Sequence, residues 1–186
     1  MNFKTALTCL TMLLCVSAIP ACAQGPNDLT IRVTLKHGER SKDSSSQTTW
    51  ITVSGDAIEW ERIFGGHHGG IPPPEKKEFA LSPADKSALL KLIESEKLFV
   101  TDAVQLPDDP STYSYFEIAV VLALAGKKGA ISMSGPMSAD KVKDQVLYQH
   151  TAALVKELYR ILHSQDRSIY LEGLSVTAGR PGTGSG

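Results

Sequence analysis

The sequence predicts an α+β fold: an antiparallel sheet of about five or six strands with two helices packed on one face. Two observations indicate this fold class. Short runs that alternate apolar and polar residues are typical of strands with one buried face, and two longer runs have apolar residues at helical spacing. The predicted order along the chain is four strands, a helix, two strands and a helix. That order fits helices segregated on one face of an antiparallel sheet.

The amino-terminal segment predicts export. In residues 1–23, Lys4 supplies a short positive region and residues 6–19 are apolar, but this stretch is too short to span a bilayer permanently. Small residues around Cys22 suit a signal peptidase, which would leave a mature chain beginning at Gln24. The same residues also form a lipobox, in which Cys22 becomes lipidated and tethers the protein to a membrane. The predicted protein is periplasmic or secreted, or membrane-anchored as a lipoprotein.

The mature chain is predicted to be one domain, residues 24–163, followed by a polar and disordered tail over 164–186. All three cysteines lie within the first 22 residues, so the folded domain is predicted to contain no disulfide. The 19 Lys and Arg side chains nearly balance the 20 Asp and Glu side chains. This balance argues against a nucleic-acid partner and against electrostatic binding to anionic lipid. Membrane attachment is expected only through Cys22.

The first strand is predicted over residues 29–36, and a hairpin follows it. A two-residue turn at 55–56 places Val53 opposite Ile58, and Ile51 opposite Trp60, so all four apolar side chains share one face. A short strand at 78–81 precedes a helix that Ser82 caps, with Pro83 at its first position, and that ends near Glu96. A surface loop at 102–111, a strand at 112–125, a turn at 126–129, a strand at 130–134 and a helix over 142–162 complete the chain.

The segment from 65 to 74 stands out because glycines and three prolines exclude an ordinary strand or helix. It is predicted to be an exposed loop that contacts a partner. His67 and His68 also make it a candidate metal site, but no third ligand accompanies them at a characteristic spacing, so no metal and no cofactor is assigned. The predicted partner-binding residues are Gly65, Gly66, His67, His68, Gly69, Gly70 and Ile71.

No residue pattern predicts catalysis. The mature chain keeps no reactive cysteine, and no serine lies in a nucleophile elbow. Asp108 and Asp109 lie between prolines, where a plain turn is expected. The loop glycines precede prolines and not a helix start, which does not match a phosphate-binding motif. The protein is therefore predicted not to be an enzyme.

Several segments together resemble the emfourin family of small proteinaceous inhibitors. The similar segments are Trp60 followed by GGHHGGI, then LSPADKSALLKLIESEKLF, then DDPSTYSYFEIAVVLALAGKKGAISM, and the terminal helix. The similarity spans residues 50–163. It implies an inhibitor of thermolysin-like metallopeptidases that acts through surface loops, with Gly65, Gly66, Gly69 and Gly70 matching the family's glycine loop. The chain departs from the family in its extra first strand, its His67–His68 and triple-proline insertion, and its export signal.

Two alternatives stay open on the sequence. One is a structural or adaptor lipoprotein of the cell envelope, with no inhibitory activity and another envelope protein as its partner. The other is a metal-binding protein that uses the His67–His68 loop.

Overall fold

The computed structural model describes residues 28–39, 46–66, 71–105, 114–136 and 146–171. Within these ranges it contains seven strands and two helices, so the predicted α+β class is confirmed. The strands are β1 Thr30–Glu39, β2 Ser46–Ser54, β3 Ala57–Gly65, β4 Glu75–Ala80, β5 Thr101–Gln105, β6 Ser114–Leu124 and β7 Lys127–Pro136, and the helices are α1 Pro83–Ser95 and α3 Val146–Gln165.

All the described strands form one sheet in the order β4-β3-β2-β1-β6-β7-β5. Five of the six neighbouring pairs are antiparallel, and β5 runs parallel to β7. The sheet is therefore mixed, whereas an antiparallel sheet was predicted. It has seven strands, whereas about five or six were predicted.

The additional strand is β5, which lies where the sequence predicted a surface loop. Its five residues lack a buried alternation, because Thr101, Asp102, Ala103 and Gln105 are all exposed. Sequence periodicity detects a strand by its buried face, and β5 is an edge strand with almost none. Only its hydrogen bonds to β7 define it as a strand.

The predicted β2–β3 hairpin is confirmed in its register. Val53 pairs with Ile58 and Ile51 pairs with Trp60, and all four side chains are buried. Gly55 opens the turn with φ of 61°, a conformation that glycine adopts without a steric penalty.

The predicted turn between β6 and β7 is displaced. The sequence predicted a turn at 126–129, whereas Leu124 pairs with Lys127 and the turn residues are Ala125 and Gly126. Both turn residues have positive φ, 48° and 82°, as a tight two-residue hairpin turn requires. Lys127 and Lys128 therefore belong to β7, and both side chains are exposed.

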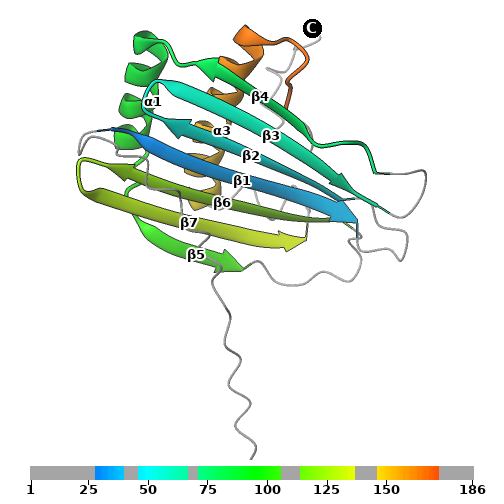
Figure 1. The fold of residues 1–186 in the computed structure, drawn as a ribbon. Coiled ribbons are helices and arrows are strands. Elements are labelled where there is room, and N and C mark those ends of the chain that lie inside the picture. Colours follow the sequence, from blue (N-terminus) through cyan, green and yellow to red (C-terminus); the bar gives the residue numbers. More distant parts are fainter. Residues whose placement is uncertain (1–27, 40–45, 67–70, 106–113, 137–145, 172–186) are drawn as a thin grey trace, which may run out of the picture.

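Figure 1 shows α1 and α3 together behind the sheet. Ser82 caps α1 through a hydrogen bond from the Asp85 N–H, and Pro83 begins the helix, as predicted. One core joins the helices to the sheet, and it includes Leu89 and Ile93 of α1. From α3 it includes Leu154, Val155, Leu158, Ile161 and Leu162, and from the central strands Ile31, Val33, Ile118, Val120 and Leu122.

The two ends of the sheet differ in their connections. At one end lie the tight β2–β3 and β6–β7 turns. At the other end β1, β3, β5 and β7 finish, while β2, β4 and β6 begin. The longer connections β1–β2, β3–β4, β5–β6 and β7–α3 therefore all leave from this second end, which we call the loop end.

The packed chain continues beyond residue 163. Helix α3 runs to Gln165, and Ile169 after it is fully buried. His163 Nδ1 lies 2.9 Å from the Ile169 carbonyl oxygen. None of the described helices is long and apolar enough to cross a membrane.

Candidate functional site

The predicted partner-binding segment connects β3 to β4 at the loop end of the sheet (Figure 1). Of its predicted residues, the structure describes Gly65, the last residue of β3, with Gly66 and Ile71. His67, His68, Gly69 and Gly70 lie outside the described residues, and so does Cys22, the candidate lipidation site. The site is therefore built from the two arms of the loop and the strands that hold them.

Gly65 lies where two strands approach closely. It pairs with Ser46 of β2, and a Cβ atom at this position would lie 2.6 Å from the Ser46 hydroxyl oxygen. A side chain would displace the serine or move the start of the loop away from β2. A similar contact lies nearby at the loop end, where Tyr115 of β6 covers Gly38 of β1.

An ion pair joins the two arms just before the loop begins. Arg62 of β3 and Glu75 of β4 occupy paired positions, and Arg62 Nη2 donates to Glu75 Oε2 over 2.9 Å. The guanidinium also lies 5.1 Å from the centroid of the Trp60 ring and 4.9 Å from that of Phe64. Such contacts attract a cation, more strongly where water is excluded, and the Arg62 side chain is only 13% exposed.

The far arm of the loop is exposed and uncharged. Ile71 is 64% exposed, and Pro72, Pro73 and Pro74 follow it, all exposed. Neither Lys, Arg, Asp nor Glu occurs from 64 to 74. A partner would therefore meet an apolar side chain set among glycines and prolines, beside a fixed ion pair.

Sequence reasoning missed Arg62, Glu75 and the two aromatic rings around the guanidinium. The predicted β2–β3 register could have placed Arg62 on the same face of the sheet as Trp60, because residues two apart in a strand share a face. Its pairing with Glu75 could not have been found, because the segment from 66 to 74, which is neither helix nor strand in its sequence pattern, separates β3 from β4.

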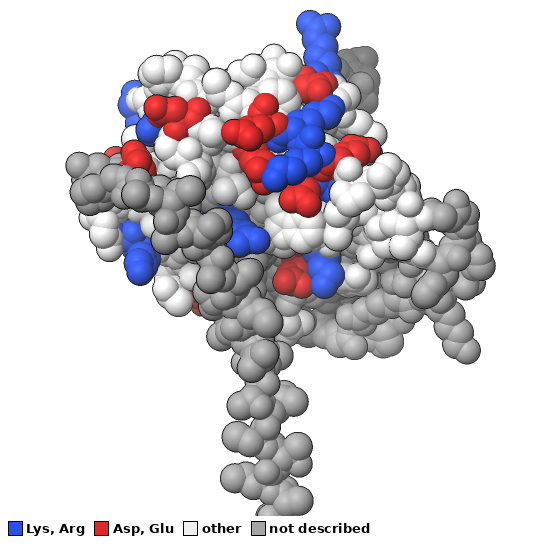
Figure 2. All heavy atoms as spheres, in the orientation of Figure 1, with Lys and Arg blue, Asp and Glu red and all other residues white. Residues whose placement is uncertain are grey.

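Charged side chains elsewhere serve mainly to join elements. In Figure 2 acidic and basic side chains intermingle over β3 and β4, where Lys76 Nζ lies 2.9 Å from Glu59 Oε2. Lys77 of β4 donates to Asp166 Oδ2 over 2.7 Å and to Ser168, which secures the chain after α3. The hydrogen bond from Lys77, followed by the hydrogen bonds from Ser168, holds the pKa of the Asp166 carboxyl well below its ordinary value.

A second network links the two helices. Arg160 Nη2 of α3 donates to Asp85 Oδ1 of α1 over 2.6 Å and to Glu157 Oε1 over 2.8 Å. The Ser82 hydroxyl and then Arg160 lower the pKa of Asp85 from its ordinary value. Further along the helices, His150 contacts Glu96 at the carboxyl end of α1. These contacts join α1 to α3.

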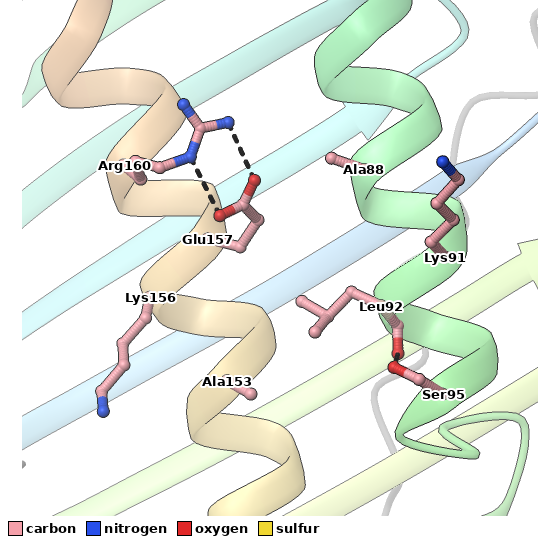
Figure 3. Close-up of a pocket in the computed structure, with 8 residues that line it drawn as sticks. All are labelled: Ala88, Lys91, Leu92, Ser95, Ala153, Lys156, Glu157 and Arg160. Atoms are coloured by element: carbon pink, nitrogen blue, oxygen red, sulfur yellow. Dashed lines mark hydrogen bonds and ion pairs between the residues drawn. The ribbon is translucent and has the colours of Figure 1, made fainter.

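A groove of about 780 Å³ lies between α1 and α3 on the side away from the sheet (Figure 3). Ala88, Leu92 and Ala153 lie along it, while Lys91 and Lys156 point outward from the two helices. Of its remaining polar groups, Glu157 and Arg160 pair with each other, and the Ser95 hydroxyl donates to the Leu92 carbonyl. Nothing in this groove converges on a ligand. Across the described ranges, no three His, Cys, Asp or Glu side chains are grouped so that they could hold a metal ion.

Comparison with models of known protein families and with curated proteins found no match to this chain.

Proposed function

We propose that the protein is exported and acts by binding and not by catalysis, as a proteinaceous inhibitor of thermolysin-like metallopeptidases. The loop that begins at Gly65 and includes Ile71 makes the contact. The emfourin resemblance points to this class of target. The structural observation that carries the proposal is the exposed Ile71 on a hairpin whose arms Arg62 and Glu75 join.

The braced hairpin favours tight binding. A binding loop loses conformational freedom when it docks, and that loss weakens affinity unless the loop is already held. The Arg62–Glu75 pair lies at the base of the loop, so β3 and β4 already fix both of its ends before a partner arrives.

The composition of the loop suits the centre of an interface. Interface cores are depleted in charged side chains, and a few apolar anchors contribute most of the binding energy. Ile71 is the one large aliphatic side chain between 66 and 74, and it is exposed in the free protein. We therefore assign Ile71 as the anchor.

The test is a titration of thermolysin with the purified protein, with cleavage of a chromogenic peptide as the readout. Stoichiometric, tight-binding inhibition is expected. Ile71→Asp should weaken inhibition by about 30-fold or more, because loss of a hot-spot anchor costs about 2 kcal/mol or more. The fold should survive this change because Ile71 is exposed.

Val146→Asp is the matched control, since Val146 is 63% exposed and lies at the start of α3. This variant should inhibit like the wild type. Absence of inhibition of thermolysin and of a second thermolysin-like enzyme would overturn the proposal. Equal inhibition by Ile71→Asp and the wild type would show that the contact lies elsewhere on the molecule.

A further inference from the structure

Three consecutive prolines, Pro72, Pro73 and Pro74, lie exposed between the anchor Ile71 and the braced Glu75. β4 begins only at Glu75, and the prolines pair with no neighbouring strand. Their place next to the proposed anchor points to a role in binding.

An inhibitor that places a loop in the cleft of a peptidase is exposed to hydrolysis. A peptide is cleaved when its backbone lies extended and is fixed in the cleft by hydrogen bonds, in the manner of an added strand. A loop with an exposed apolar anchor would be a substrate unless its backbone prevented this alignment.

Proline prevents it in two ways. Proline has no backbone N–H, so none of the residues 72, 73 and 74 can donate a backbone hydrogen bond. Its ring also holds φ near −65°, and each proline restricts the residue before it to extended conformations. Ile71 is thereby restricted as well. The chain beside Ile71 is then stiff, and it cannot donate the backbone hydrogen bonds that a strand makes to its neighbour.

We propose that Pro72, Pro73 and Pro74 make the loop resistant to the peptidase that it inhibits, and hold Ile71 at a set distance from the braced stem. This inference rests on the proposed function. In the polyproline conformation each residue advances about 3.1 Å, so Ile71 would stand roughly 12 Å from Glu75. Glu75 is fixed by Arg62, whose side chain packs over two aromatic rings.

The test compares the wild type with a variant carrying Pro72→Ala, Pro73→Ala and Pro74→Ala. Each is incubated with an equal concentration of thermolysin, and intact mass and residual peptidase activity are followed together. The wild type should stay intact and keep inhibiting. The variant should be cut within residues 65–75 at least about tenfold faster, and peptidase activity should return as the cut protein accumulates.

Two further variants sharpen this experiment. Pro72→Ala alone restores one N–H directly after the anchor, so its cleavage rate should lie between those of the wild type and the triple variant. Pro83→Ala is the matched control, because Pro83 is exposed at the start of α1 and away from the loop end. It should be as resistant as the wild type. Circular dichroism establishes that each variant is folded.

The outcomes separate this inference from the proposed function. If the triple variant remains intact and inhibits like the wild type, the inference is overturned and the proposed function stands. Cleavage of the wild-type loop during inhibition would also overturn the inference without affecting the proposed function. If the wild type does not inhibit but the triple variant is cut faster at 65–75, the proposed function is wrong, and the prolines protect the segment from hydrolysis without any role in inhibition. Absence of both effects overturns both.

Discussion

Two residues other than glycine have left-handed backbone conformations, Lys97 with φ of 54° and Ala125 with φ of 48°, among the residues that the structure describes. Lys97 follows the end of α1. Its N–H donates to the Glu94 carbonyl and the N–H of Leu98 donates to that of Ile93, over 3.2 and 3.0 Å. This is the hydrogen-bond pattern with which many helices end, and glycine usually occupies the left-handed position. The Cβ of lysine is unfavourable there.

We therefore expect Lys97→Gly to stabilise the protein by roughly 1 kcal/mol. Urea denaturation of the two proteins measures the free energy of unfolding. Lys91→Gly is the control, because the same substitution inside α1 should destabilise by about 1 kcal/mol. Destabilisation by both substitutions would contradict the assigned left-handed conformation at residue 97.

At the scale of elements, the polar contacts between α1 and α3 include a carboxylate whose pKa is shifted by folding. Asp85 lies in the first turn of α1, where it also complements the positive end of the helix dipole. Its carboxylate accepts from Ser82, the residue that caps α1, and from Arg160 of α3. Folding lowers the pKa of Asp85, mainly through Ser82 and then through Arg160.

A lowered pKa in the folded state sets the direction of a pH effect. The folded protein binds fewer protons at Asp85 than the unfolded chain does. The stabilisation is present above the unfolded pKa of about 3.9 and is lost as the pH falls through the lower folded pKa. The free energies of unfolding of the wild type and Asp85→Asn should therefore differ most at pH 7 and converge below about pH 4.

Urea denaturation at pH 7, 5, 4 and 3 measures this convergence. Arg160→Gln is the matched partner variant, and it should also lose part of the pH-dependent stabilisation while keeping the contribution from Ser82. A difference between wild type and Asp85→Asn that stays the same at every pH would contradict the assigned network.

At the scale of the whole molecule, the antiparallel topology separates a tight-turn end from a loop end. The proposed binding segment lies at the loop end, where four connections leave the sheet. The signal predicted in the amino-terminal segment would determine where the protein is located. Cleavage before Gln24 would release the domain, whereas lipidation of Cys22 would hold it at a membrane.

Cys22→Ser distinguishes these two routes. If Cys22 is lipidated, the substitution should move the protein from the membrane fraction to the soluble fraction of exporting bacterial cells, and the wild type should carry a lipid by mass spectrometry. If the wild type is already soluble and begins at Gln24, simple cleavage is correct. Cys15→Ser is the control, because it also removes a cysteine from the predicted signal but leaves Cys22 in place, and it should not change the fraction in which the protein is found.

Local patterns in the sequence determined the α+β class, the β2–β3 register and the start of α1. Each depends on residues that are close in the chain: a two-residue turn aligns Val53 with Ile58, and Ser82 caps its own helix. The sequence also predicted that the segment 65–74 is an irregular loop, because the backbone preferences of glycine and proline are local properties of those residues.

Only the tertiary structure decided the features that join distant residues. The strand β5 is defined by its parallel pairing with β7, and Arg62 meets Glu75 only because β3 and β4 are neighbours. The short turn at Ala125 was equally hidden, since the pairing of Leu124 with Lys127 imposes on alanine a conformation that it does not favour by itself. Pairing across a sheet is a cooperative property of whole strands, so it can override the local conformational preference of a residue at a turn or in an edge strand.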